Sequence, residues 1–236
     1  MPKPCILILL LICLYPALSY GNTDSLPAKY LSLGSRKAGI CFGNSPEYTG
    51  FRFNAVNKHV RRVNIFDFTL WNAGDDTVQT SNGIAISATI ISQYKSNGIT
   101  IAPLVNAAAR VNGLTLSGIA SASGRMNGVA LGGMINYIDT INGVLVGVGA
   151  ISFTNNTRPT SVANGLVVGP SFIRMGRVNG ITLAAINESD AHTGLALGVY
   201  NKSRKLRGVQ IGLFNIVENN PRGLQRLPFI NMHLGK

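Results

Sequence analysis

Hydrophobic positions recur in a short pattern along most of the chain. An apolar residue lies one position and three positions after a recurring glycine, and a small residue usually lies four positions after it. This alternation with a period of two, rich in β-branched residues, predicts β-strands. We expect the two apolar columns to form a thin core of two aliphatic layers, and the position between them to face solvent.

The recurring glycine returns about every 15 residues, so the pattern is an internal repeat. It defines thirteen candidate repeats, with Ile65 standing where one glycine is expected. We name these positions the markers. They are Gly39, Gly50, Ile65, Gly83, Gly98, Gly113, Gly128, Gly143, Gly165, Gly180, Gly194, Gly208 and Gly223.

Asparagine occupies two further columns of the repeat. Asn before Gly favours positive φ and tight turns, so two Asn columns predict two bends in each coil. Stacked Asn side chains can also hydrogen-bond to one another along the stack. The column directly before the marker comprises Asn64, Asn82, Asn97, Asn112, Asn127, Asn142, Asn164 and Asn179. The column seven or eight residues after the marker comprises Asn57, Asn72, Asn106, Asn136, Asn187, Asn201, Asn215 and Asn231.

The repeat is compatible with two kinds of all-β architecture. A single Asn-Gly pair is typical of a hairpin, which allows an antiparallel β-meander or a small outer-membrane β-barrel. However, Pro103, Pro170 and Pro228 fall five residues after a marker, where a membrane-spanning strand of ~10 residues needs an uninterrupted ladder. Identical columns at constant phase also suit coils that stack like on like. We therefore expect a β-solenoid of about thirteen coils of ~15 residues, with the meander or barrel as the alternative.

The N-terminal segment differs from the repeats. A short basic start precedes an apolar run at residues 6–14 and then a proline and small residues, a pattern typical of a secretory signal peptide. We expect residues 1–21 to be a signal peptide, residues 22–38 an N-terminal cap or linker, and residues 39–236 the repeat β domain. Insertions near 73–80 and 154–161 indicate surface loops.

Several segments carry a more specific signature. They are TGFRFN at residues 49–54, VNIFDFTLW at 63–71, LRGVQIGLFNI at 206–216 and LPFIN at 227–231. Together with the tandem Asn-Gly-aliphatic-x-aliphatic repeat, this signature resembles exported bacterial surface-repeat proteins, a functionally uncharacterised family. The resemblance covers roughly residues 39–234 and implies the repeat architecture and an exported bacterial origin. It implies no catalytic residue.

Composition and charge narrow the function. The 236 residues are 46% hydrophobic, which excludes general disorder, and the 27 glycines argue against a helical protein. Only 13% of residues are charged, yet the net charge is +12.

A base lies three residues before seven of the markers, which predicts a basic edge for a polyanion such as anionic envelope lipid or polysaccharide. These bases are Arg36, Arg62, Lys95, Arg110, Arg125, Arg177 and Lys205. A solvated edge that resists lateral aggregation is the simpler interpretation. Few aromatic residues are interleaved with the bases, so we expect no nucleic acid.

Acids and histidines show no catalytic or metal-binding pattern. The chain lacks the nucleophile-elbow, phosphate-loop and dinucleotide motifs, and its acid pairs lack a calcium-loop pattern. His59, His192 and His233 are far apart, and we expect them at the surface or in caps. Cys41, the one cysteine after the signal peptide, is expected to be a buried structural thiol. We therefore expect no metal and no cofactor.

The sequence thus predicts an exported, non-enzymatic surface protein located in the periplasm, the outer membrane or at the cell surface. An integral outer-membrane barrel is one alternative. An enzyme would require acids such as Asp67, Asp139 and Glu188 to converge from distant repeats. An ice- or carbohydrate-binding solenoid is a further alternative, because Thr100, Thr115 and Thr182 share the column expected to face solvent.

Overall fold

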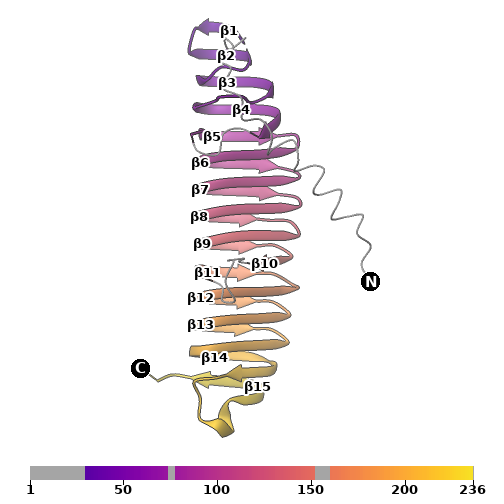
Figure 1. Cartoon of the computed structure of the whole chain (residues 1–236), viewed down its shortest axis with the longest axis vertical. Helices are drawn as coiled ribbons and strands as arrows, with labels where there is room; N and C mark the ends of the chain where they lie inside the picture. Colours follow the sequence, from indigo (N-terminus) through magenta and orange to yellow (C-terminus); the bar gives the residue numbers. More distant parts are fainter. Residues whose placement is uncertain (1–29, 74–77, 152–159, 236) are drawn as a thin grey trace, which may run out of the picture.

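The computed structural model describes residues 30–73, 78–151 and 160–235, which form a long β-solenoid (Figure 1). The predicted signal peptide lies outside the described residues. So do residues 22–29 of the predicted cap or linker, residues 74–77 of the first insertion and residues 154–159 of the second.

Fifteen strands make up the sheet of the solenoid. They are β1 (Tyr30–Ser35), β2 (Ala38–Gly43), β3 (Glu47–Val56), β4 (Arg62–Ala73), β5 (Thr80–Ser87), β6 (Ile90–Ala102), β7 (Val105–Ser117), β8 (Ala120–Leu131), β9 (Ile135–Val146), β10 (Gly149–Ile151), β11 (Val162–Val168), β12 (Phe172–Leu183), β13 (Ile186–Leu197), β14 (Tyr200–Val217) and β15 (Arg226–His233). A 3-10 helix, η2 (Arg222–Leu224), precedes the last strand.

Strands β2 to β14 pair in parallel, each with its neighbours along the stack. Each marker pairs with the next, as Gly98 does with Gly113 and Gly113 with Gly128. The register joins residue i to residue i+15 there and to i+14 between Gly180 and Gly194. The predicted β-solenoid is therefore confirmed, and the pairing is not the antiparallel one that single Asn-Gly pairs allowed.

The stack has fewer coils than the thirteen expected. Twelve markers, Gly39 to Gly208, lie in one continuous ladder, which fits about 11 turns. Gly223 is not a thirteenth marker, because it lies in η2 and the strand that follows runs antiparallel to β14. At the opposite end β1 also pairs antiparallel, with β2. Antiparallel strands thus terminate the parallel stack at both ends (Figure 1).

The insertion before β11 leaves the marker ladder continuous. Gly143 on β9 pairs directly with Gly165 on β11, although 22 residues separate them in the chain. The short strand β10 fills the other side of this coil and pairs with both β9 and β12. The insertion therefore does not shift the register of the stack.

In the strand segment after each marker, every side chain faces the side opposite to the predicted one. Residues two after the marker point inward, and all twelve are buried: Cys41, Arg52, Asp67, Ala85, Thr100, Thr115, Ala130, Leu145, Val167, Thr182, Ala196 and Gln210. The apolar residues one and three after the marker face outward, as Ile181 and Leu183 do with 43% and 45% of their surface exposed. The prediction that these two apolar columns form the core was therefore wrong.

The marker glycine has the same phase as these inward residues. At Gly113 a Cβ would lie closer than 3.0 Å to the carbonyl oxygen of Gly98 on the strand below, and φ is +131°, a conformation that suits glycine. Residues two positions to either side of Gly113, Val111 and Thr115, are buried. Because strand side chains alternate, the glycine takes the inward position and its immediate neighbours must face outward.

The interior is narrow and partly polar. Its main apolar cluster lies between β7 and β12 and includes Met126, Ile141 and Ile173. The second Asn column, expected at bends, also lies inside: Asn187 donates to Asn201 over 2.8 Å, and Asn201 donates to Asn215 over 2.8 Å. Polar side chains can occupy this interior because hydrogen bonds along the stack satisfy many of their groups.

Candidate functional site

A ladder of asparagines runs along the outside of the solenoid just before the markers. In each rung the side-chain nitrogen donates to the side-chain oxygen of the Asn on the preceding rung, over 2.7–2.8 Å from Asn82 to Asn179. Asn64, at the start, donates to Thr49 Oγ1 over 2.9 Å. The predicted Asn ladder is confirmed, and it gives this edge of the molecule a regular polar border.

Three of the seven predicted bases come together beside this border. The register places Lys95, Arg110 and Arg125 on consecutive rungs of β6, β7 and β8, ~4.8 Å apart. We name these three residues the basic column. They lie two residues before the Asn ladder and, like it, on the outer surface. Their spacing is within the Debye length of ~8 Å at physiological salt, so the three charges act on one another and on a common ligand.

The remaining four bases are further apart. Thr80 separates Arg62 from Lys95, and Ala191 separates Arg177 from Lys205. Two neutral rungs lie between Arg125 and Arg177. Arg36 lies in the turn between β1 and β2, outside the ladder. The structure therefore concentrates the predicted basic edge into its central three residues.

The basic column has no acidic partner in the part of the chain that the structure describes. None of its three members forms an ion pair within 4.0 Å, and the Arg110 guanidinium stacks 5.6 Å from the centre of the Tyr94 ring. The C-terminal third is different. There Arg174 pairs with Glu188, Lys202 with Glu218, and Arg204 with Asp190, over 3.4–3.7 Å. Positive charge without an ion pair within 4.0 Å is thus centred on β6 to β8.

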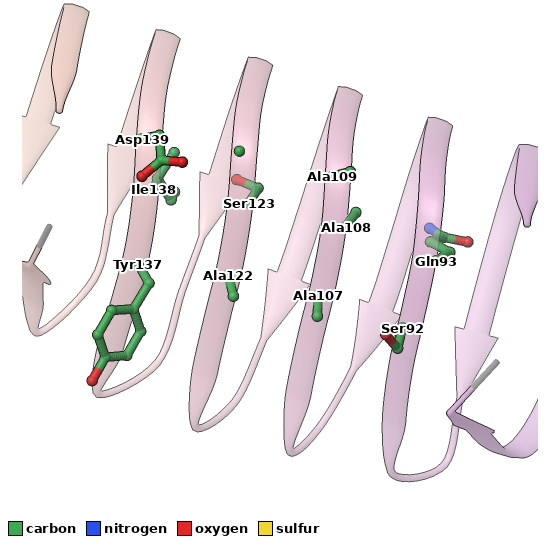
Figure 2. Close-up of a pocket in the computed structure, with 11 residues that line it drawn as sticks. Ser92, Gln93, Ala107, Ala108, Ala109, Ala122, Ser123, Tyr137, Ile138 and Asp139 are labelled. Atoms are coloured by element: carbon green, nitrogen blue, oxygen red, sulfur yellow. The ribbon is translucent and has the colours of Figure 1, made fainter. Parts of the chain in front are cut away.

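A shallow hollow of about 380 Å³ is lined by residues of β6 to β9, among them the acidic residue Asp139 (Figure 2). Its floor spans β7 and β8 and consists of small residues, among them Ala107, Ala109 and Ala122. Figure 2 shows this floor between Gln93 on β6 and Tyr137 on β9. Ala109 directly precedes Arg110 in the sequence, so the column follows one border of the hollow. A chain-like ligand can therefore approach the sheet closely beside three cations.

The acids considered for catalysis do not converge. Asp67 is on β4, Asp139 on β9 and Glu188 on β13, and the stack keeps these strands apart. Asp67 lies inside the solenoid, where Arg52 donates to its two carboxylate oxygens over 2.9 and 2.7 Å. Both side chains are almost fully buried, with exposures of 0% for Arg52 and 2% for Asp67. This pair was not predicted from the sequence, although its members are 15 residues apart in one column.

Several histidine, threonine and cysteine side chains lie inside the solenoid. His192 is buried, so the expectation that all histidines lie at the surface or in caps was wrong. Thr100, Thr115 and Thr182 are buried too, which removes the basis for a threonine ice-binding face. Cys41 is buried as expected, and this burial raises the pKa of its thiol. Within the described ranges no group of three or more His, Cys, Asp or Glu side chains is arranged to hold a metal ion.

No helix of the described residues has the length and hydrophobicity needed to cross a membrane. Comparison of the chain with protein-family models, with curated proteins and with solved structures finds no match.

Proposed function

We propose that this protein is an exported, non-enzymatic structural protein of the bacterial surface-repeat type, and that its basic column binds a linear polyanion of the cell envelope. One observation carries the proposal. Lys95, Arg110 and Arg125 stack on consecutive rungs without acidic partners, beside a hollow floored by small residues.

The arrangement favours a polymer over a compact anion. The three bases form a straight row with the ~4.8 Å spacing of the strands, so their charges are distributed along a line and do not converge on one point. Neighbouring like charges repel, and a chain with regularly spaced negative groups relieves this repulsion on every rung. An acidic polysaccharide is such a chain, and the hollow gives its backbone room to lie along the sheet.

The absence of an enzymatic role is part of the same proposal. Acid-base chemistry needs titratable groups within hydrogen-bonding distance of one substrate. The acids considered above, Asp67, Asp139 and Glu188, lie on separate strands, and Asp67 is held inside by Arg52. The predicted signal peptide and the resemblance to exported repeat proteins support a location in the envelope.

The proposal is tested by reversing the charge of the column. Lys95→Glu, Arg110→Glu and Arg125→Glu, combined in one variant, should weaken binding to polygalacturonate by at least about tenfold in calorimetry at 0.15 M salt. The matched control combines Arg62→Glu, Arg177→Glu and Lys205→Glu. It changes the net charge equally but alters separated rungs, so it should retain most of the affinity.

Three outcomes contradict the proposal. Equal losses in the two triple variants would mean that bulk charge, and not the column, attracts the polymer. Unchanged binding in the column variant would show that the basic column is not the binding site for the polymer. Binding of the native protein to anionic vesicles but not to the soluble polymer would instead assign the column to a lipid surface. Circular dichroism spectra of both variants, compared with that of the native protein, test whether the variants fold.

A further inference from the structure

A continuous apolar surface runs along the whole solenoid on the strand segments that follow the markers. We name it the apolar face. One column comprises Ile40, Phe51, Phe66, Ile84, Ile99, Leu114, Val129, Val144, Leu166, Ile181, Leu195 and Val209. The other comprises Phe42, Phe53, Phe68, Ile86, Ile101, Leu116, Leu131, Val146, Val168, Leu183, Leu197 and Ile211. None of these side chains is buried, so the face is open to solvent in a single chain.

The terminal strands extend the face although they run in the opposite direction. On β1, Leu31 pairs with Phe42 and Leu33 pairs with Ile40. On β15, Met232 pairs with Val209 and Ile230 pairs with Ile211. The insertion does not interrupt it, because Val144 pairs directly with Leu166. The face therefore continues from one end of the stack to the other.

The size of the face exceeds what a lone soluble chain normally exposes. Fourteen rungs at ~4.8 Å and a width of about four residues give an area of roughly 900 Å². The largest apolar patch on a typical monomer is about 300–600 Å². A standard protein interface buries about 800 Å² on each partner. The apolar face is thus large enough, by itself, for a stable dimer.

We propose that the apolar face is an interface at which two copies of this chain pack sheet against sheet. The net charge of the chain is +12, yet every residue in the two columns is Ile, Leu, Val or Phe. The basic column lies on the strand segments before the markers, whose outward side chains point away from this face. An anionic lipid surface would be met by the basic side, whereas the uncharged apolar side suits an equally uncharged apolar partner.

Geometry also favours a second copy. The rungs of this face repeat at the strand spacing of ~4.8 Å, and only another sheet with the same repeat matches it along its full length. Two such sheets interdigitate their side chains at a separation of about 10 Å. Isologous contact of this kind uses the same patch on both copies and closes after two, which leaves both basic columns exposed.

The test measures the mass of the full chain in solution. Native protein should sediment at twice the mass of a single chain at micromolar concentration. Leu114→Glu combined with Ile181→Glu places two charges in the apolar face and should give single chains. The control, Ala109→Glu with Thr193→Glu, adds the same charge at exposed positions before the markers and should remain dimeric.

Three results would overturn the proposal: single chains of native protein, a dimer that survives both face substitutions, or native single chains that float with neutral phosphatidylcholine vesicles. The last would assign the face to lipid. If the glutamate variant fails to fold, Leu114→Ala with Ile181→Ala replaces it. This milder pair should weaken dimerisation by at least about tenfold, because it removes two large side chains from the interface centre.

Discussion

Gly113 shows how a single residue controls the path of a coil. A Cβ at this position would collide with the Gly98 carbonyl, and φ of +131° is unfavourable for other residues. We predict that Gly113→Ala destabilises the protein by about 2 kcal/mol or more in urea denaturation. Gly223→Ala is the matched control, because nothing lies within 4 Å of the added carbon there. Equal denaturation midpoints for the two variants would contradict the steric explanation.

Ile65 shows that the marker position is imposed by the stack and not by glycine alone. The sequence places Ile65 where a glycine is expected, and the structure gives it a positive φ of +84°, below the +111° to +150° of the marker glycines in the ladder. A β-branched residue adopts such a backbone only at a cost in free energy. The column was therefore predicted correctly even at the one position where its residue type fails.

His192 makes the stability of the protein depend on pH. It lies inside the stack between Val178 and Leu206, and burial lowers its pKa below the ordinary 6.5, although backbone hydrogen bonds with Gly180 and Leu195 oppose the shift. The unfolded chain therefore binds a proton that the folded chain does not. Stability from this residue is present above about pH 6.5 and is lost as the pH falls below it.

We predict that the urea midpoint of the native protein falls between pH 7.5 and pH 5.5, and that His192→Gln reduces this fall. Carboxylates titrate mainly below this window, so they contribute little to the slope. The exposed His59→Gln serves as control and should keep the native pH dependence. An unchanged slope in the His192 variant would exclude the buried imidazole as its source.

The Asn ladder is the device that couples neighbouring strands on the outside. Asn112 donates to Asn97 and accepts from Asn127, each over 2.8 Å. Asn112→Ala removes both bonds and leaves one amide donor and one acceptor unpaired. We predict a loss of about 1–2 kcal/mol in the free energy of unfolding. Thr193→Ala, on a rung beyond the end of the ladder, should change it by less than about 0.5 kcal/mol.

The strands were predictable in position but not in orientation. The marker, the Asn ladder and the repeat length came directly from the sequence. The inward direction did not, because hydrophobic residues at Ile99 and Ile101 usually indicate a core, whereas here Thr100 between them is buried. The marker glycine is required by close stacking, because an added Cβ would meet the carbonyl of the neighbouring rung, but this does not fix which side faces inward. A sequence pattern of period two contains no information about this choice.

At the scale of the whole molecule, stacking converts sequence columns into surfaces. The basic column follows from the repeat, because a base at the same phase in three successive repeats must become a row of three. The hollow beside it was not predicted, since it depends on the small outward residues around Ala107 and Ala109 being bordered by Tyr137 on a later rung. The apolar face was not predicted because the apolar side chains after each marker were expected to face inward.

During folding, a stack of similar coils can form errors of register. Coils with the same columns can pair one whole repeat out of place and still satisfy most of their contacts. Arg52 distinguishes the correct neighbour, because it meets a carboxylate only when β3 lies against β4; the next inward positions on either side are Cys41 and Ala85. A slipped stack would bury the guanidinium without a partner, at a cost of about 3–5 kcal/mol. The buried ion pair thus favours the correct register of β3 against β4 over a register shifted by one repeat.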